Sequence, residues 1–424
     1  MRRCVNGSSS SRRRIVAGRV AVAALAVVGT VAVSVGPAGA GGGNSILGTK
    51  DPAKGAPVKV GVISNGKSAS LDNSDEGKVA KATAQWVNAY QGGLGGRPIE
   101  VVLCEDGNDP GKAADCANQM VREGVVAVVI GQNGVLEPSW KILNPAGIPV
   151  FIYGTGNPNI TASPNATYNL VSPKSTLLGL PAGVAKKEKA KKVTAVVIDV
   201  PSATAIFEQQ GPAYMKAQKL DYEVVTVPIG TADMTAQMQR LVTTNRDGVV
   251  MVIGNDAFCI AAFNGLRTAG FEGTVTTILQ CITDATRTAL PNGELKGIQI
   301  SSYSPLTDTK NPAIKQYNAV LDTYGAKDVD RTNVVGMAMF NAFGAFAVAA
   351  HGVKGDVTPA SVDAAIRSMT QSVAPGSGGL TFRCNGKVDP AEPSVCSYAT
   401  HAAVLDAKGE PVKYVVVGNA TIPD

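Results

Sequence analysis

A nucleotide-binding motif is the first chemistry that the sequence suggests. Gly61, Gly66, Lys67 and Ser68 have the spacing G-x-x-x-x-G-K-S of a phosphate-binding loop. Such a loop needs a strand that ends before its first glycine and a helix that starts at its Lys-Ser pair, so that backbone N–H groups converge on the phosphates. Here Gly61 lies inside a predicted strand, and a polar loop follows Ser68. We therefore predict that this loop does not bind a nucleotide.

Catalytic and metal-binding motifs are also missing from the sequence. The two histidines, His351 and His401, form no metal-ligand or catalytic spacing with the cysteines, and neither a nucleophile elbow nor a zinc-binding His pair occurs. No C-x-x-C spacing is present either. These observations disfavour an enzyme and predict a protein without a metal or a cofactor.

Six cysteines follow residue 40, and they are arranged as three neighbouring pairs: Cys104 with Cys116, Cys259 with Cys281, and Cys384 with Cys396. An even number in an oxidising compartment favours disulfides. Local pairing is one of 15 connectivities open to six cysteines, and it is the one that closes short loops within single structural units. A bridge between Cys259 and Cys281 would also tie together two loops that follow predicted strands, and it would pre-organise that wall of a binding site.

Residues 1–40 have the features of an export signal. Arginines without any acid precede an apolar run, Val20 to Val35, and small residues lead to a predicted cleavage after Ala40. Residues 11–16 also resemble a twin-arginine motif, so the export route stays open. An uncleaved anchor is the alternative to cleavage, because the run is near the length that spans a bilayer. No cysteine follows the run, so no lipid attachment is expected, and we predict a periplasmic or extracellular cell-surface protein.

The basic character of the chain belongs to this leader. It holds six of the 39 basic residues, and the remaining 33 equal the 33 acidic residues. A neutral chain without an Arg-rich patch gives no electrostatic case for binding nucleic acid or a membrane surface.

From Pro57 onward, predicted strands alternate with predicted helices. The first series has strands at 58–63, 99–103, 125–130 and 150–152, with helices at about 75–90, capped by Ser74 or Asp75, and at 110–122. The second series has strands at 193–198, 223–227, 249–253 and 274–279, and helices at 312–324, 332–351 and 358–369 follow it. Repeated strand-helix-strand units form parallel sheets with helices on both faces. We therefore predict an α/β protein with two Rossmann-like lobes.

The positions of the two series predict how the lobes share the chain. We expect residues 41–56 to be a flexible linker, 57–171 with 302–376 to form the first lobe, and 172–301 with 377–424 to form the second. The chain would then cross between the lobes three times.

Ligands of open α/β sheets bind at the carboxyl ends of the strands. The polar residues that follow the predicted strands are Asn65, Lys67, Ser68, Gln132, Asn133, Tyr153, Thr155, Asp199, Ser202, Asn255, Asp256 and Gln280. We expect amide hydrogen bonds from Gln132, Asn133 and Gln280, a hydroxyl from Thr155, and closing contacts from Asp256. The alternative for each residue is a structural role, because Asn and Asp also cap helices and shape turns. Lys67 could likewise neutralise an anionic ligand or point into water.

Three longer segments resemble a known family. They are WVNAYQGGLGGRPIEVVLCEDGNDPGKAADCANQMV from Trp86, VVAVVIGQNGVLEPSWKILNPAGIPVFIYGTGN from Val125, and LRTAGFEGTVTT from Leu266. Together they are similar to type I periplasmic solute-binding proteins of the branched-chain amino acid and amide branch, which feed ABC importers. The resemblance implies two lobes joined by a three-segment hinge, closure on a small solute that is amino-acid-like, an amide or otherwise polar, an ABC permease as partner, and no catalysis. A same-fold ligand sensor that signals to a partner is the alternative function.

The site residues depart from the pattern of that family. Gln132-Asn133-Gly134 and Gly154-Thr155-Gly156 stand where the family commonly has the Ser or Thr and the Ala-Thr step that hold a ligand carboxylate. Gln280 stands where an acid commonly meets the ligand ammonium, and Ala203 and Asn255 stand where aromatic residues are expected. A zwitterionic α-amino acid is therefore disfavoured as the ligand, because its charges would be buried without charged partners.

Overall fold

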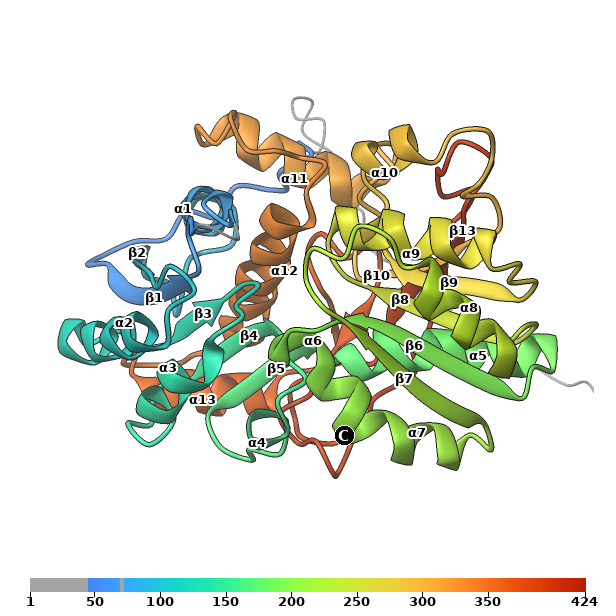
Figure 1. Ribbon diagram of the computed structural model, residues 1–424. Coiled ribbons are helices and arrows are strands. Elements are labelled where there is room, and N and C mark those ends of the chain that lie inside the picture. The colour runs from blue at the N-terminus through green and yellow to red at the C-terminus, as the bar shows by residue number, and fades with distance from the viewer. Residues whose placement is uncertain (1–44, 69–71) are drawn as a thin grey trace, which may run out of the picture. The chain divides into compact units, whose positions relative to one another are not determined.

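The computed structural model describes residues 45–68 and 72–424, so the predicted export signal lies outside the described residues. The described chain forms two α/β lobes, each built on its own sheet (Figure 1). A third, two-stranded sheet pairs β11 (Ser372–Val373) with β12 (Thr381–Phe382).

The first sheet has five strands in the order β2-β1-β3-β4-β5, and all of its pairings are parallel. Its strands are β1 (Val58–Ser64), β2 (Ile99–Glu105), β3 (Val128–Ile130), β4 (Val150–Gly154) and β5 (Thr167–Val171). Every residue of β3 and β5 is buried, because helices cover both faces of a parallel sheet. The sequence of β3 is wholly apolar, whereas β5 also buries the polar side chains of Thr167 and Asn169. The sequence analysis missed β5, and β3 begins three residues later than predicted.

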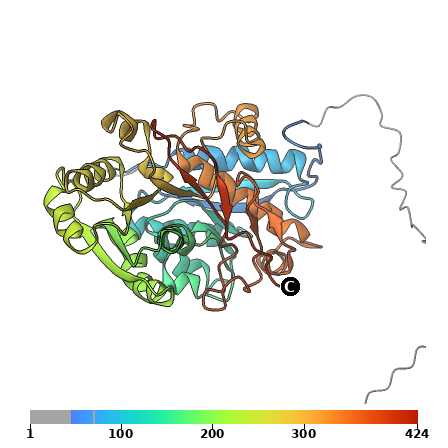
Figure 2. The same cartoon turned by 90° about the vertical axis from the view of Figure 1, so that its right-hand side faces the viewer.

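The second sheet has seven strands in the order β14-β13-β10-β9-β8-β6-β7. They are β6 (Lys192–Ile198), β7 (Asp221–Val227), β8 (Val249–Ile253), β9 (Thr274–Ile278), β10 (Gln299–Ser302), β13 (Thr400–Val404) and β14 (Val415–Val417). The first five are parallel, whereas β13 and β14 add an antiparallel edge beside β10 (Figure 2). The parallel strands of both sheets thus follow the same order, second-first-third-fourth-fifth.

Helices connect the strands in both lobes. The first lobe has α1 (Asp75–Tyr90), α2 (Pro110–Glu123), α3 (Leu136–Leu143) and α4 (Pro158–Thr161). The second series has η1 (Lys174–Gly179), α5 (Leu180–Glu188), α6 (Pro201–Ala205), η2 (Ile206–Gln210), α7 (Gly211–Ala217), α8 (Thr235–Thr244), α9 (Asp256–Thr268), η3 (Leu279–Cys281) and α10 (Asp284–Ala289). After β10 come α11 (Pro312–Thr323), α12 (Val334–Ala349), η4 (Ala350–Gly352) and α13 (Pro359–Ser368).

The late helix α12 supplies the core of the first lobe although it is distant in sequence. It packs on α1, β3 and β4, and its Phe340 and Phe346 rings lie 5.8 Å from Trp86 and 6.1 Å from Phe151. Residues 334–352 are long and apolar enough to cross a membrane, but 83% of their most apolar window is buried within the protein. We therefore interpret α12 as a core helix that packs in the first lobe.

The start of the described chain packs on α1. The indole nitrogen of Trp86 donates to the carbonyl of Leu47 at 2.9 Å, and the backbone of Asp51 bonds to that of Ala89. The described residues of the expected linker therefore lie against the first lobe. The predicted cap of α1 is wrong, because Ser74 makes no capping bond and its hydroxyl donates to Asp72 instead.

All three local disulfides are present, joining Cys104 to Cys116, Cys259 to Cys281 and Cys384 to Cys396. The third one closes a loop that runs beside the first crossing between the lobes. In this loop the carbonyl of Ser394 accepts from the N–H of Asn169 in β5, and the carbonyl of Ser397 accepts from Ser172. Two segments that each lead into the second lobe, one before β6 and one before β13, are thereby held side by side.

Candidate ligand-binding site

The strand order places one candidate site at a corresponding point of each lobe. In a sheet of order 2-1-3-4-5, the connections leave the first and third strands in opposite directions, and a crevice opens at their carboxyl ends. This point lies between β1 and β3 in the first lobe and between β6 and β8 in the second. Most of the predicted site residues follow these four strands.

A buried carboxylate organises the loops of the first lobe. Asp106, which follows β2, is fully buried and accepts hydrogen bonds from the side-chain amides of Asn65 at 2.8 Å and Asn133 at 2.7 Å. The side-chain oxygen of Asn65 accepts from the backbone N–H of Gly134, and that of Asn133 accepts from the backbone N–H of Val135. These two asparagines, predicted to meet the ligand, therefore hold the loops after β1 and β3 together.

A second buried carboxyl group lies beneath the loop after β3. Glu76, in the first turn of α1, accepts from the hydroxyl of Ser64 at 2.7 Å and from the backbone N–H of Gln132 at 2.6 Å. Burial raises the pKa of Glu76 to about 8, nearby Asp106 adds to the increase, and the two hydrogen bonds oppose it. Gly131 is required here, because a Cβ at this position would lie 2.0 Å from the Glu76 Oε1.

Two glutamines from opposite lobes meet at the predicted site. The side-chain nitrogen of Gln280, after β9, donates to the side-chain oxygen of Gln132, after β3, at 3.2 Å. Nearby, the side-chain nitrogen of Gln210 donates to the carbonyl of Gly156 at 3.0 Å, again between the lobes. The structure thus brings together the strand ends of the two lobes through side-chain amides.

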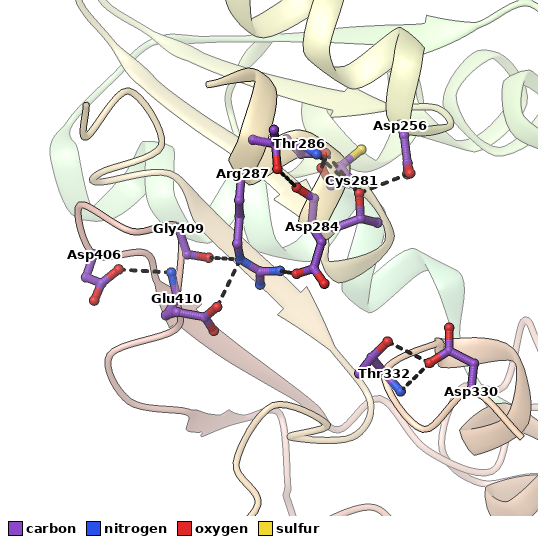
Figure 3. Close-up of polar contacts among 12 residues, drawn as sticks. Asp256, Cys281, Asp284, Thr286, Arg287, Asp330, Thr332, Asp406, Gly409 and Glu410 are labelled. Carbon is purple, nitrogen blue, oxygen red and sulfur yellow. Dashed lines mark hydrogen bonds and ion pairs between the residues drawn. The ribbon is translucent and has the colours of Figure 1, made fainter. Parts of the chain in front are cut away.

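The loops of the second lobe are more open. Asp199 and Asn255 are exposed, and the Asn255 side chain caps α9 by accepting from the N–H of Phe258. Asp256 accepts from the hydroxyl of Thr283 at 3.0 Å, at the turn that also carries Cys281 and Thr286 (Figure 3). The Cys259–Cys281 disulfide links α9 to this same turn.

Tyr153 lies near the end of β4 and Thr155 directly follows that strand, and the two residues face different environments. Asn169 holds the backbone of Thr155, accepting from its N–H and donating to its carbonyl, both at 3.0 Å, while the Thr155 hydroxyl oxygen accepts from the N–H of Asn157. The ring of Tyr153 packs edge-on against Tyr303, which follows β10, with ring centroids 6.0 Å apart. Burial raises the pKa of both phenols, and the Tyr303 hydroxyl has no hydrogen-bond partner within the described chain.

Three predicted residues remain, namely Lys67, Ser68 and Ser202. Lys67 is largely exposed and forms an ion pair with Asp72 at 2.9 Å. Ser68 beside it is half-buried, whereas the side chain of Ser202 lies outside what the structure describes. Within residues 45–68 and 72–424, no group of His, Cys, Asp and Glu side chains is arranged to hold a metal ion.

Sequence reasoning missed several residues that shape this site, namely Asn73, Glu76, Asp106, Asn169, Gln210 and Tyr303. Asp106 follows a predicted strand, so the strand-end rule could have selected it. Glu76 could not be selected from the sequence, because an acid in the first turn of a helix is common and usually only complements the helix dipole. Gln210 lies within a helical stretch and has no sequence signal that separates it from a surface glutamine.

A separate hollow of about 500 Å³ opens beside the start of β7, lined by residues such as Pro212, Lys219 and Tyr222. It lies at the amino end of a parallel strand, whereas ligands of this architecture bind at the carboxyl ends. We therefore do not assign it to ligand binding.

Comparison with protein families gives one match that spans most of the chain. The model described as periplasmic binding protein matches residues 57–395. A comparison with curated proteins finds no match.

Solved structures share the fold at low sequence identity. An extracellular ligand-binding receptor from Verminephrobacter eiseniae has a TM-score of 0.66 at 15% identity, with 84% of this chain and 100% of that chain covered. LivJ from Streptococcus pneumoniae, in complex with isoleucine, has a TM-score of 0.62 at 19% identity, with coverage of 85% and 99%. A solute-binding protein of an ABC transporter from R. palustris, in complex with 4-hydroxybenzoate, has a TM-score of 0.65 at 19% identity, with coverage of 86% and 97%.

Proposed function

The chain belongs to the periplasmic binding protein family, and from this premise we propose that it captures a small polar solute between its lobes and delivers it to an ABC importer. Family membership implies an extracytoplasmic location, which suits a protein with three disulfides. The proposal includes binding without chemical conversion of the solute.

The observation that carries this proposal is the hydrogen bond between Gln132 and Gln280. Both side chains are half-buried, come from opposite lobes and follow strands at the point where such sheets bind ligands. A solute that replaces or bridges this amide pair would gain contacts with both lobes only when they are close together. Such differential affinity is what drives hinge closure.

Binding and closure can be tested on the purified protein. A thermal-shift screen across amino acids, amides, urea derivatives, aromatic acids and sugars should find a stabilising ligand, because a ligand that binds only the folded state raises the melting temperature. Small-angle scattering with and without that ligand should then show a smaller radius of gyration in the complex. An unchanged radius at saturation would count against hinge closure.

Delivery to an importer requires a cellular experiment. We expect deletion of the gene to abolish uptake of the ligand found in the screen, and complementation to restore it. Intact uptake together with a lost transcriptional or signalling response would instead identify the protein as a ligand sensor.

A further inference from the structure

Several backbone N–H groups at the first-lobe strand ends already have partners within the protein. After β3, the N–H groups of Gln132, Gly134 and Val135 donate to side-chain oxygens of Glu76, Asn65 and Asn133, at 2.6, 3.1 and 2.8 Å. A ligand carboxylate bound at this loop would have to compete with these internal acceptors. The competition holds whether Glu76 is ionised or protonated, because its Oε1 accepts in both forms.

The neighbouring loops are satisfied in the same way. After β4, the N–H of Thr155 donates to Asn169 at 3.0 Å, and the N–H of Asn157 donates to the Thr155 hydroxyl at 3.2 Å. After β1, the N–H of Gly66 donates to the Ser64 hydroxyl at 3.1 Å. Each of these N–H groups would have to leave its internal acceptor before it could bind the carboxylate of a buried ligand.

Acceptor oxygens, in contrast, remain at this edge of the sheet. Asn73 is 2% exposed and donates to the carbonyl of Gln132 at 3.1 Å, while its own Oδ1 has no partner among the described residues. The side-chain oxygen of Gln132 faces the amide of Gln280. A buried acceptor without a donor is costly, so a ligand that supplies N–H groups would be favoured.

The charges at the site point the same way. The stretches that matter here are the described loops that follow β1, β3, β4, β6, β8 and β9, together with the first residue of the helix after each loop. Within these stretches, Lys67 is the only basic residue. Lys67 is 74% exposed and is paired with Asp72. Acids such as Asp199, Asp256 and Asp284 occupy the corresponding positions of the second lobe. In these described loops the one positive charge that could neutralise an anionic ligand is therefore exposed and already paired with a carboxylate.

Given the proposed binding function, we propose that the site selects a ligand that donates N–H hydrogen bonds and carries no carboxylate, such as a carboxamide, a urea or an amine. This class differs from the isoleucine and 4-hydroxybenzoate found in the neighbouring structures, each of which carries a carboxylate. The amide pair of Gln132 and Gln280 is the complement that a carboxamide would insert into or bridge, accepting from its NH₂ group and donating to its carbonyl.

Matched ligand pairs test this class directly. Isothermal titration of the exported protein should compare acetamide with acetate, isoleucinamide with isoleucine, 4-hydroxybenzamide with 4-hydroxybenzoate, and butylamine with butyrate. We expect at least one amide or amine to bind at least tenfold more tightly than its acid, and the amine pair shows whether a cation is preferred to a neutral donor. An acid that binds as tightly as the matching amide or amine would overturn the proposed ligand class, but it would support the proposed solute-binding function. If no compound of any pair binds, the proposed ligand class is wrong. The wider thermal-shift screen then tests separately whether the protein binds a small solute at all.

Two substitutions of one residue sharpen the test. Gln132→Glu keeps acceptor oxygens and removes the donor, whereas Gln132→Met has a similar length and removes both. For the preferred amide or amine, we expect Gln132→Glu to raise the dissociation constant by no more than threefold and Gln132→Met to raise it at least tenfold. Equal losses in the two variants would show that Gln132 does not serve as an acceptor. Gln280→Glu and Gln280→Met provide a second pair if either first variant fails to fold.

Discussion

The two lobes have the same parallel strand order, yet they hold their strand-end loops in different ways. In the first lobe, the buried carboxyl groups of Glu76 and Asp106 bond to the loops after β1 and β3. In the second, Asp199 and Asn255 are exposed, and the Cys259–Cys281 disulfide and the Asp256–Thr283 contact connect two of the loops. The comparison teaches that one topology can be pre-organised by a buried hydrogen-bond network or by a covalent link. We expect the first lobe to engage the ligand before the second closes over it.

Breaking the first-lobe network should have the largest effect. Asp106→Ala leaves the side-chain amides of Asn65 and Asn133 and the N–H of Asn108 without their acceptor. Since an unsatisfied buried donor costs about 1–3 kcal/mol, we expect the free energy of unfolding to fall by roughly 3–5 kcal/mol in urea denaturation. The matched second-lobe variant, Asp199→Ala, removes an exposed acid and should change it by less than about 0.5 kcal/mol. Similar losses in the two variants would remove the contrast between the lobes.

The second carboxyl group should make the stability of the first lobe depend on pH. The folded protein keeps the proton of Glu76 up to about pH 8, whereas the unfolded chain releases it near the ordinary pKa of 4.5. Ionisation therefore opposes folding increasingly between these values, by at most about 1.4 kcal/mol per pH unit.

Glu76→Gln removes this titration while keeping a side chain of the same size. We expect its unfolding free energy, relative to the wild type, to rise from pH 5 to pH 8 and then to level off. At pH 4 the Glu76 carboxyl is protonated in both states for most molecules, so the pH-dependent advantage of the variant should be absent. A difference between variant and wild type that stays constant from pH 4 to pH 8 would contradict the raised pKa.

Removing the second-lobe disulfide tests whether this covalent link pre-organises the strand-end loops of the second lobe. Replacing both Cys259 and Cys281 with Ser should lower the unfolding free energy by about 3 kcal/mol in the chain-entropy model. Because the bridge ties α9 to the turn after β9, the ligand affinity should weaken more than it does after the matched replacement of Cys104 and Cys116 in the first lobe. Equal affinities in the two double variants would show that the Cys259–Cys281 bridge does not organise the site.

The smallest effect is expected at Tyr303, which follows β10 where the chain leaves the second lobe. Its hydroxyl is buried and has no partner among residues 45–68 and 72–424, so Tyr303→Phe should leave the ligand-free protein unchanged or stabilise it by up to about 1 kcal/mol. A loss of ligand affinity in this variant would place the hydroxyl in contact with the ligand. A clear loss of stability without ligand would mean that the hydroxyl has a partner in the native protein.

The sequence predicted the strand-end site in outline but not the roles of its residues. The strand-end rule selected Gln132 and Gln280, which do meet, because the carboxyl ends of parallel strands share one edge of a sheet. The same rule selected Asn65 and Asn133, whose side chains bond to Asp106. An asparagine that follows a strand has the same local signal whether it faces a ligand or a buried carboxylate.

By itself, the sequence determined the alternation of strands and helices, the two α/β lobes and the resemblance to solute-binding proteins, and it favoured the pairing of neighbouring cysteines. These features depend on local periodicity and short separations along the chain, which a linear pattern contains. The chain also resembled its family in long segments rather than at the binding residues.

Only the tertiary structure decided which strands adjoin and which polar groups are already satisfied. It placed α12 inside the first lobe, set Glu76 beneath Gln132, and brought Gln132 to Gln280 across 148 residues of sequence. The physical reason is that burial and hydrogen-bond partners are properties of groups brought together from distant parts of the chain. A side chain's own neighbours in sequence do not contain that information.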